Sequence, residues 1–325
     1  MSTTSTANRI RAFADEILQE FSFSLERPIS HSGLSLVPIV PVEEPLMSEE
    51  FINAAEAFEI ESLVITEAGD AVNTIIAKNT GQKPILIEES EVLIAPNSQD
   101  RIVVSSMIIQ PGEEKRIPVK CVHAPHGLNR GAGFHSTGAS SLQLKSKVRA
   151  MKYCSIMTDV EHYQPETAVD QSEVWSEVER YCKTLGMEDP TKYTDALAKV
   201  QEKATEVAME IRNSLPDNTC GVIVINSAGE AVAFEMYRRP QAFNKRGGYL
   251  ESLAVELFDN EKKPLEGEAA WSSALQLLMK MKEIDDDKIA SKDDSESAMI
   301  GLDELRGEVV LASGSESILY CSLSL

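Results

Sequence analysis

The chain has 325 residues and is acidic, with 52 aspartates and glutamates against 31 lysines and arginines and a net charge of −21. At about 100–200 residues per domain, this length suggests two domains or one large one. The composition, 42% apolar and 26% charged, is typical of a folded globular protein. An acidic surface repels nucleic-acid phosphates, and no run of about 18 apolar residues predicts a membrane span. We therefore expect neither nucleic acid nor a membrane as a partner.

Cysteine usage and the N-terminus point to a cytoplasmic protein. The first residues lack the apolar core of a secretory signal peptide. An odd number of scattered cysteines fits reduced thiols better than a disulfide framework. The five are Cys121, Cys154, Cys182, Cys220 and Cys321.

The N-terminal half is expected to be rich in strands. Residues 1–27 hold an amphipathic helix over 5–21, because apolar side chains recur there at helical spacing. From 28 to 165, short β-rich runs are separated by turn-forming residues, which predicts a β-sandwich-like or barrel-like domain. The runs are Leu34–Val42, Ile60–Glu67, Val72–Lys78, Ile85–Ile87, Glu91–Ala95, Arg101–Ile109, Glu114–Val122 and Leu142–Val148.

The second half, over 168–325, changes to the helical period of 3.6 and adds two β-hairpins. The predicted fold class is therefore α+β, with an N-terminal β-sandwich-like domain followed by a helix and β-hairpin region. The charged stretch 285–296 is expected to be an exposed acidic loop. Helices are predicted over Gln171–Leu185, Tyr193–Leu215, Pro240–Phe258 and Trp271–Ile284, and hairpins over Gly221–Met236 and Gly307–Ser324.

Basic residues are concentrated in one segment of this acidic chain. Residues 101–152 carry nine basic and two acidic side chains. A local positive field can attract an anionic ligand despite the negative total. Arg101 is then expected to contribute more binding energy than an exposed lysine such as Lys145, because its guanidinium can bind bidentately. The alternative is that these side chains cover the solvent faces of strands.

The same segment holds potential metal ligands in the spacing C-x-H-x2-H-x8-H. Cys121, His123 and His126 are candidate ligands of a divalent metal, and Cys121, His123 and His135 are candidate catalytic groups. The spacing matches no standard zinc signature. The alternative interpretation is a core cysteine beside exposed loop histidines.

Other candidate ligand-binding residues lie in three places. The glycine-rich loop 127–138 could bring backbone N–H groups close to a phosphate, with Arg130 as a further donor, or it is a mobile surface loop. Gln99 and Arg101 share one face of an extended chain, or form a turn with a surface arginine. Gln171 and Trp175 are neighbours on one helix face, where a tryptophan more often anchors packing.

These motifs resemble, in their order, the family of ARG and rhodanese-phosphatase-superfamily-associated proteins, where ARG denotes ADP-ribosylglycohydrolase. The family pattern reads Q-N-R, I-P-V-x-C-V-E and G-R-W. Gln99, Arg101 and Cys121 match it, whereas Asp100 replaces the asparagine, His123 replaces the glutamate and the Gly127–Arg130 segment departs from G-R-W. If that glutamate is a catalytic acid, the histidine puts catalysis in doubt; if it is a metal ligand or hydrogen-bond partner, histidine can substitute for it.

The resemblance implies recognition or processing of an ADP-ribose or NAD-derived nucleotide in the cytosol, by an unknown reaction. The partners it implies are an anionic nucleotide-like small molecule and ADP-ribose-processing enzymes. One alternative is a metal-dependent hydrolase that uses Cys121, His123 and His135. Another is a non-enzymatic protein-interaction module.

Overall fold

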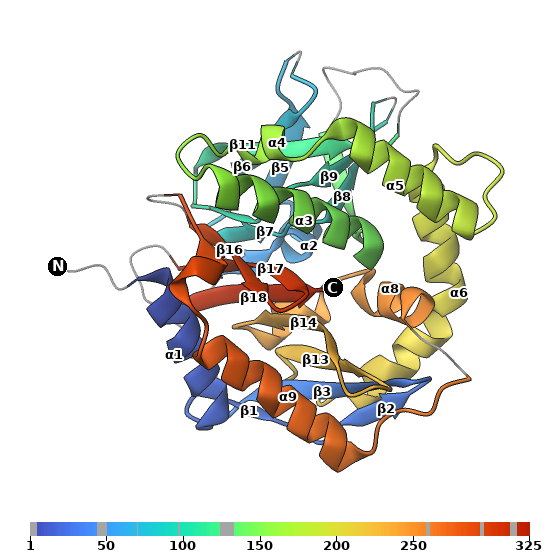
Figure 1. The fold of residues 1–325 in the computed structure, drawn as a ribbon. Coiled ribbons are helices and arrows are strands. Elements are labelled where there is room, and N and C mark those ends of the chain that lie inside the picture. Colours follow the sequence, from blue (N-terminus) through green and yellow to red (C-terminus); the bar gives the residue numbers. More distant parts are fainter. Residues whose placement is uncertain are drawn as a thin grey trace. The chain divides into compact units, whose positions relative to one another are not determined.

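The computed structural model describes residues 5–43, 51–69, 71–96, 98–123, 133–257, 261–292, 296–312 and 317–325. The chain forms two compact units, each built from separated stretches of sequence. Unit 1 comprises the described parts of Met1–Glu49, Val207–Asn244 and Leu257–Leu325, and unit 2 those of Glu50–Glu206 and Lys245–Glu256. Helices and sheets occur together, which confirms the α+β class (Figure 1). None of the described helices is both long and apolar enough to span a lipid bilayer.

The predicted boundaries near residues 28 and 168 differ from those of the two units. β3 (Leu34–Pro41) pairs with β13 (Gly221–Asn226), so the strand after residue 28 belongs to the sheet of unit 1. α5 (Gln171–Thr184) instead packs its apolar face on strands of unit 2. Hydrophobic periodicity reports local structure, and it does not show which distant strand a segment joins.

Six described strands of unit 2 close into an antiparallel barrel, in the order β11, β6, β5, β12, β8 and β9. Alternate side chains fill the interior, among them Ile65, Ile75, Leu93, Val119 and Phe134. Of the sandwich-like and barrel-like architectures that the strand spacing allows, the structure has the barrel. The strands are β5 (Leu63–Glu67), β6 (Thr74–Asn79), β8 (Glu91–Ile94), β9 (Arg101–Val103), β11 (Glu114–Cys121) and β12 (Gly133–Ala139).

A small sheet and several helices complete unit 2. β4 (Ile52–Asn53), β7 (Ile85–Ile87) and β10 (Met107–Ile109) form the small sheet, so the predicted strand over Arg101–Ile109 is divided between two sheets. The outward side chains of the barrel strands pack on α3, α5 and the start of α6. The remaining bounds are α2 (Ala54–Glu59), α3 (Leu142–Thr158), α4 (Pro165–Ala168), α8 (Tyr249–Glu256) and α6 (Tyr193–Ser214), whose residues from Val207 onward belong to unit 1.

The predicted strand over Leu142–Val148 is wrong, because this segment opens helix α3. Ser141 caps the helix, and its hydroxyl accepts the N–H of Leu144 at 3.2 Å. The buried face of α3 includes Lys145, Arg149 and Lys152 beside its apolar residues. Because charged residues occupy core positions, the helical period of the apolar residues is incomplete and the remaining leucines mimic the alternation of a strand.

Unit 1 is one antiparallel sheet with helices on a face. Its nine described strands follow the order β1, β3, β13, β14, β18, β17, β16 and β15, with β2 also paired to β3. The predicted hairpin of β13 and β14 is confirmed, and β17 pairs with β18 as expected. The other bounds are β1 (Phe23–Leu25), β2 (Ile29–His31), β14 (Ala231–Tyr237), β15 (Ile289–Ala290), β16 (Ser297–Leu302), β17 (Leu305–Leu311) and β18 (Ile318–Ser324).

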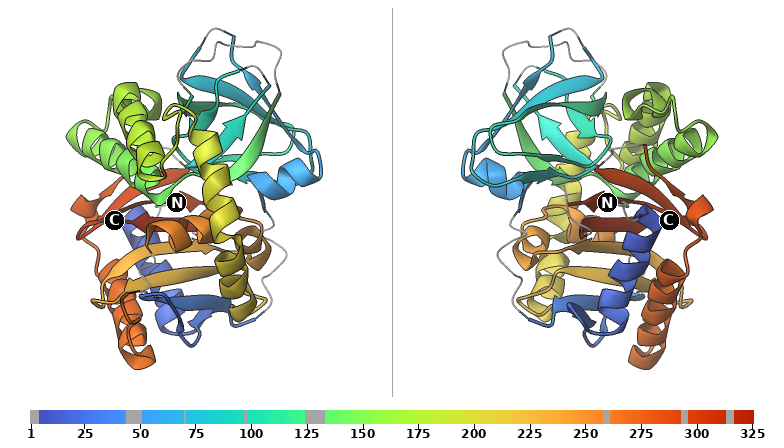
Figure 2. Two further views of the ribbon diagram at one scale, coloured as in Figure 1. Left: turned by 90° about the vertical axis from the view of Figure 1, so that its right-hand side faces the viewer. Right: turned by 90° about the vertical axis from the view of Figure 1, so that its left-hand side faces the viewer.

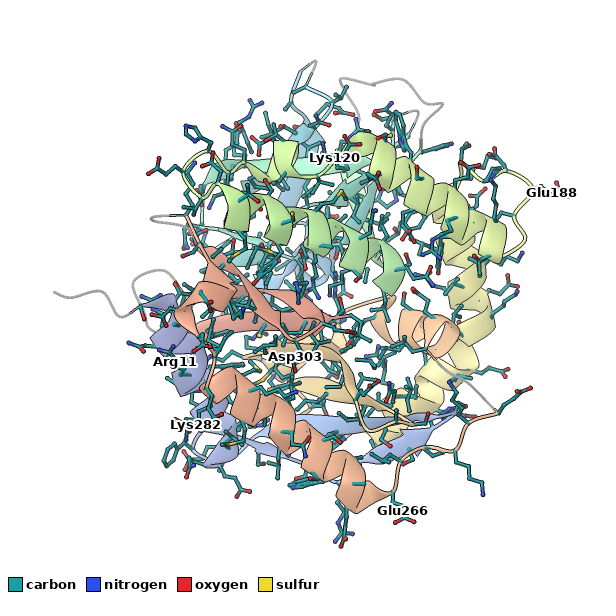
Figure 3. The ribbon with its side chains drawn as sticks, viewed as in Figure 1. Arg11, Lys120, Glu188, Glu266, Lys282 and Asp303 are labelled. Carbon is teal, nitrogen blue, oxygen red and sulfur yellow. The ribbon has the colours of Figure 1, made fainter. Side chains whose placement is uncertain are left out.

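Helices α1 (Thr6–Leu18) and α9 (Gly267–Lys282) lie side by side on one face of this sheet (Figure 2). Their apolar side chains form one core with inward residues of the strands. Lys282 of α9 also pairs with Asp15 of α1 at 2.6 Å (Figure 3). The predicted helix over Pro240–Phe258 is divided into α7 (Pro240–Asn244) and α8, with glycine at 247 and 248 between them.

The stretch 285–296 is more ordered than the predicted acidic loop. A 3₁₀ turn over Asp286–Lys288 leads into β15, which pairs with β16 at the edge of the sheet. Arg11 of α1 donates to the Ile284 carbonyl from Nη2 at 2.6 Å and pairs with Asp286, also at 2.6 Å (Figure 3). A strand of only two residues between charged segments has too short an apolar pattern to be recognised from the sequence. Residues 293–295 lie outside the described residues.

Candidate functional site

The motifs of the sequence converge at one end of the barrel. β5 ends there at Glu67, β9 begins at Arg101 and β11 ends at Cys121. Cys121 lies directly opposite Arg101, and Arg101 lies opposite Leu93, whose side chain is in the barrel core. Residues directly opposite each other share a face of the sheet, so Arg101 and Cys121 point inward. We call Glu67, Ser98, Asp100, Arg101, Cys121, His123, Gln171, Trp175 and Thr194 the barrel-end cluster.

Arg101 and Glu67 form a buried ion pair inside this end of the barrel. Their side chains are 0% exposed, and Nη2 of Arg101 lies 3.5 Å from Oε1 of Glu67. The same Oε1 accepts the hydroxyl of Ser98 at 2.6 Å, and Nη1 of Arg101 donates to the Gln99 carbonyl at 3.0 Å. Burial lowers the pKa of Arg101 while Glu67 opposes the shift, and a guanidinium remains charged in proteins.

Within the part of the chain that the structure describes, two polar atoms of this ion pair have no hydrogen-bond partner. They are Nε of Arg101 and Oε2 of Glu67, and both are buried. Leaving a buried donor or acceptor unsatisfied costs about 1–3 kcal/mol, and more for a charged group. An unpartnered donor on one member of a buried ion pair and an unpartnered acceptor on the other leave hydrogen-bonding groups that a ligand or water can satisfy.

Cys121 is a protonated thiol in this setting. Its Sγ–H donates to the His123 carbonyl at 3.3 Å, and Sγ accepts the His123 N–H at 3.4 Å. Burial raises the pKa of Cys121, although Arg101 and a hydrogen bond with Trp175 act in the opposite direction. Since the thiolate is the nucleophile and the metal ligand, the neutral thiol is a weak candidate for either role.

Gln171 and Trp175 reach the cluster from the first turns of α5. Both polar atoms of the Gln171 amide bind the Cys121 backbone: Oε1 accepts its N–H at 3.0 Å and Nε2 donates to its carbonyl at 2.8 Å. Gln171 thus attaches α5 to the end of β11 and positions Trp175 next to Cys121. The Trp175 residue is 40% exposed, which leaves part of the indole accessible to a ligand.

His123, Asp100 and Thr194 lie at the rim of the cluster. The Thr194 hydroxyl donates to Oδ2 of Asp100 at 2.9 Å, and Nδ1 of His123 lies 3.6 Å from the same oxygen. The side chain of His123 is 12% exposed and that of Asp100 is 11% exposed. His123, which stands in place of the family's glutamate, is therefore held beside a carboxylate instead of supplying one.

Among the described residues, one predicted site residue, His135, does not point into the barrel end. His135 is exposed on β12, on the opposite face from the core residue Phe134. His126 and Arg130 lie outside the described residues, as does most of the glycine-rich loop, whose last part forms β12. Across the described ranges, no three histidine, cysteine or acidic side chains are placed to hold a metal ion.

Several of the described cations of residues 101–152, on barrel strands and on α3, lie beside acids. Lys120 donates to the Glu166 carbonyl at 2.8 Å (Figure 3), and Lys147 pairs with Glu173 at 2.6 Å. Lys145, taken as an exposed lysine from the sequence, is only 3% exposed. The expected positive field is therefore reduced where these cations pair with carboxylates.

A second polar cluster in unit 2 carries no sequence motif. Glu89 binds Arg149 and Lys152 of α3, the latter at 2.8 Å. Glu91 accepts from Arg246 and from Ser136. Ser90 between the two glutamates has a φ of 69°, a backbone conformation unusual for a residue with a side chain.

Glu67, Ser98 and Thr194 are the members of the barrel-end cluster that the motifs do not include. Glu67 continues the alternation of Leu63 and Ile65, so the strand pattern itself places this carboxylate on the core face. A charged residue at a core position of a predicted strand is the signal that could have identified it.

Comparison with known proteins gives one family match. No curated protein and no solved structure matches the chain significantly. The family model of the ARG and Rhodanese-Phosphatase-superfamily-associated Protein domain matches residues 22–323, a range that contains the whole barrel-end cluster. The resemblance inferred from the motifs is thereby confirmed, and the chain belongs to the ARG and Rhodanese-Phosphatase-superfamily-associated Protein family.

Proposed function

We propose that the barrel-end cluster recognises ADP-ribose or another NAD-derived nucleotide. The observation that carries this proposal is the pair of unpartnered buried atoms, Nε of Arg101 and Oε2 of Glu67, beside the half-exposed Trp175. The ligand class comes from the family name, which links the domain to ADP-ribosylglycohydrolase. A cytoplasmic location stays a prediction from the sequence.

The parts of such a nucleotide correspond to different members of the cluster. The accessible part of Trp175 offers an aromatic surface to the adenine base, and stacking of this kind contributes about 1–3 kcal/mol per base in single-stranded nucleic-acid complexes. The Arg101–Glu67 pair offers hydrogen bonds to the sugar end. Because both of these side chains are fully covered, the ligand reaches them only after groups at the rim move, so we expect slow association.

The cluster favours recognition over thiol chemistry. The raised pKa of Cys121 keeps the thiol protonated at neutral pH, and His135 is exposed on another face of β12. His123 thus lies beside Cys121, whereas His135 faces away from the barrel interior into which Cys121 points, which speaks against the hydrolase alternative. The family name also supports an ADP-ribose-processing enzyme as the partner protein of this domain.

Tryptophan fluorescence tests the proposal directly, since the chain has two tryptophans. In a Trp271→Phe variant, Trp175 is the sole indole, and we expect ADP-ribose to change its emission saturably. The matched control is Trp175→Phe, which keeps Trp271 and should show no saturable change. In the Trp271→Phe background, Arg101→Lys should weaken binding more than Lys147→Ala, because it removes the Nε donor.

The proposal fails if ADP-ribose and NAD leave the emission of Trp175 unchanged up to about 1 mM, which corresponds to a binding free energy weaker than about −4 kcal/mol. A response of equal size in both single-tryptophan variants would also contradict it, since the signal would then not come from the barrel end.

A further inference from the structure

The charge of the Arg101–Glu67 pair limits what this part of the site can bind. One guanidinium and one carboxylate lie together with 0% exposure, so the pair is neutral as a whole. A phosphate or carboxylate placed against Arg101 would also lie next to Glu67, and like charges in a buried setting repel strongly. The pair therefore differs from an exposed arginine that binds anions.

Among the described residues, two polar atoms of the pair make no hydrogen bond, one on a donor group and one on an acceptor group. Arg101 uses Nη1 for the Gln99 carbonyl and Nη2 for Glu67, and a further side-chain hydrogen bond joins it to Cys121. Glu67 uses Oε1 for Ser98 and Arg101. Nε of Arg101 and Oε2 of Glu67 remain.

We propose that this pair recognises a neutral group that both accepts and donates a hydrogen bond, and that it discriminates against anionic groups. In an NAD-derived ligand, two groups have this chemistry: the carboxamide of nicotinamide and the hydroxyls of the ribose next to it. The phosphates then bind elsewhere. This inference rests on the proposed function and specifies which part of the nucleotide enters the barrel end.

A series of ligands, tested on a protein whose binding site is unchanged, shows whether the pair binds the carboxamide or the ribose hydroxyls. The ligands are NAD, its analogue with a carboxylate in place of the carboxamide, ADP-ribose and ADP, each titrated against the Trp271→Phe chain. If the carboxamide binds, NAD should be about tenfold or more tighter than both the carboxylate analogue and ADP-ribose. If the ribose hydroxyls bind, NAD, its analogue and ADP-ribose should be similar, and ADP about tenfold weaker.

Equal affinities for all four ligands would overturn the inference while leaving the proposed function intact, because adenine and phosphate alone would then account for binding. Absence of binding by all four would overturn the proposed function and, with it, the inference.

A substitution of Glu67 gives an independent test. Glu67→Gln keeps the size of the side chain but leaves Arg101 with a net positive charge, so the carboxylate analogue should gain about tenfold or more relative to NAD. Glu114→Gln, on the exposed start of β11, is the matched control and should leave the order of ligands unchanged. An unchanged order in a folded Glu67→Gln protein would contradict the inference. If this variant does not fold, the ligand series alone decides.

Discussion

Glu89 shares its carboxylate between two cations of α3, Arg149 and Lys152, and all three residues are no more than 1% exposed. Burial alone would raise the pKa of Glu89, but the charges of Arg149, Lys152 and Lys145 outweigh it and lower the pKa to about 2. A carboxylate whose pKa is lowered by folding stabilises the protein at pH values above 4.5, the ordinary pKa of glutamate. This stabilisation is lost as the pH falls from 4.5 through about 2.

Glu89→Gln is expected to destabilise unit 2 by about 3–5 kcal/mol, because it leaves two buried cations without their counter-charge. Glu179→Gln is the control, since it breaks an exposed ion pair with Lys183 on α5 that contributes about 1 kcal/mol or less. Denaturant unfolding of both variants measures the difference. If both substitutions lowered the free energy of unfolding equally, the ion pairs of Glu89 with Arg149 and Lys152 would contribute no more than an exposed ion pair.

At the scale of single elements, α3 depends on a residue distant in sequence. Glu256, at the end of α8, accepts the backbone N–H groups of Leu142 and Gln143 at 2.9 Å each. A carboxylate at this position satisfies donors of the first helical turn that have no partner within the helix. Burial, with a contribution from Glu177, nevertheless raises its pKa to about 7.

The raised pKa of Glu256 predicts a pH dependence of stability. The folded protein holds the proton up to about pH 7, whereas the unfolded chain releases it near 4.5. Stability from this group is therefore complete below pH 4.5, decreases as the pH rises to 7 and is constant above it. We expect the difference in melting temperature between the natural chain and Glu256→Gln, taken as natural minus variant, to decrease as the pH rises from 4.5 to 7. A difference that is independent of pH would contradict the assignment.

Elements with an uninterrupted apolar period could be predicted, whereas α3, whose period is interrupted by three buried cations, could not. α5, α6 and the β13–β14 hairpin follow their apolar periodicity. α3 was obscured by Lys145, Arg149 and Lys152, because their burial depends on Glu89 more than fifty residues earlier in sequence. The sequence identified Arg101 and Cys121 as candidate site residues. It could not show that Arg101 pairs with Glu67, because closure of the barrel brings these two residues together.

At the scale of the whole molecule, neither unit is a continuous stretch of chain. The outward residues Val92, Ile102 and Val122 of the barrel segment are 0% exposed. They belong to one core with residues of α5 and α6, which follow the predicted boundary near 165. β3, which precedes the barrel, needs β13 as its partner.

A fragment of residues 28–165, cut at the boundaries that the sequence predicts, is therefore expected not to fold. It would expose the outer face of the barrel and leave β3 without its partner strand. Circular dichroism and urea titration against the full chain provide the measurement. A fragment with native-like near-ultraviolet signal and a cooperative transition would show that the barrel is independent of α5 and α6.

The charged stretch around β15 has a consequence for behaviour at high concentration. β15 is the last described strand at its edge of the sheet, and only two residues long. Asp286, Asp287 and Lys288 precede it directly, and Lys292 follows. Open sheet edges recruit strands from other molecules, and short edges flanked by charge discourage this. We therefore expect the charged flanks of β15 to oppose edge-to-edge aggregation, and we expect salt to weaken this protection by screening the charges.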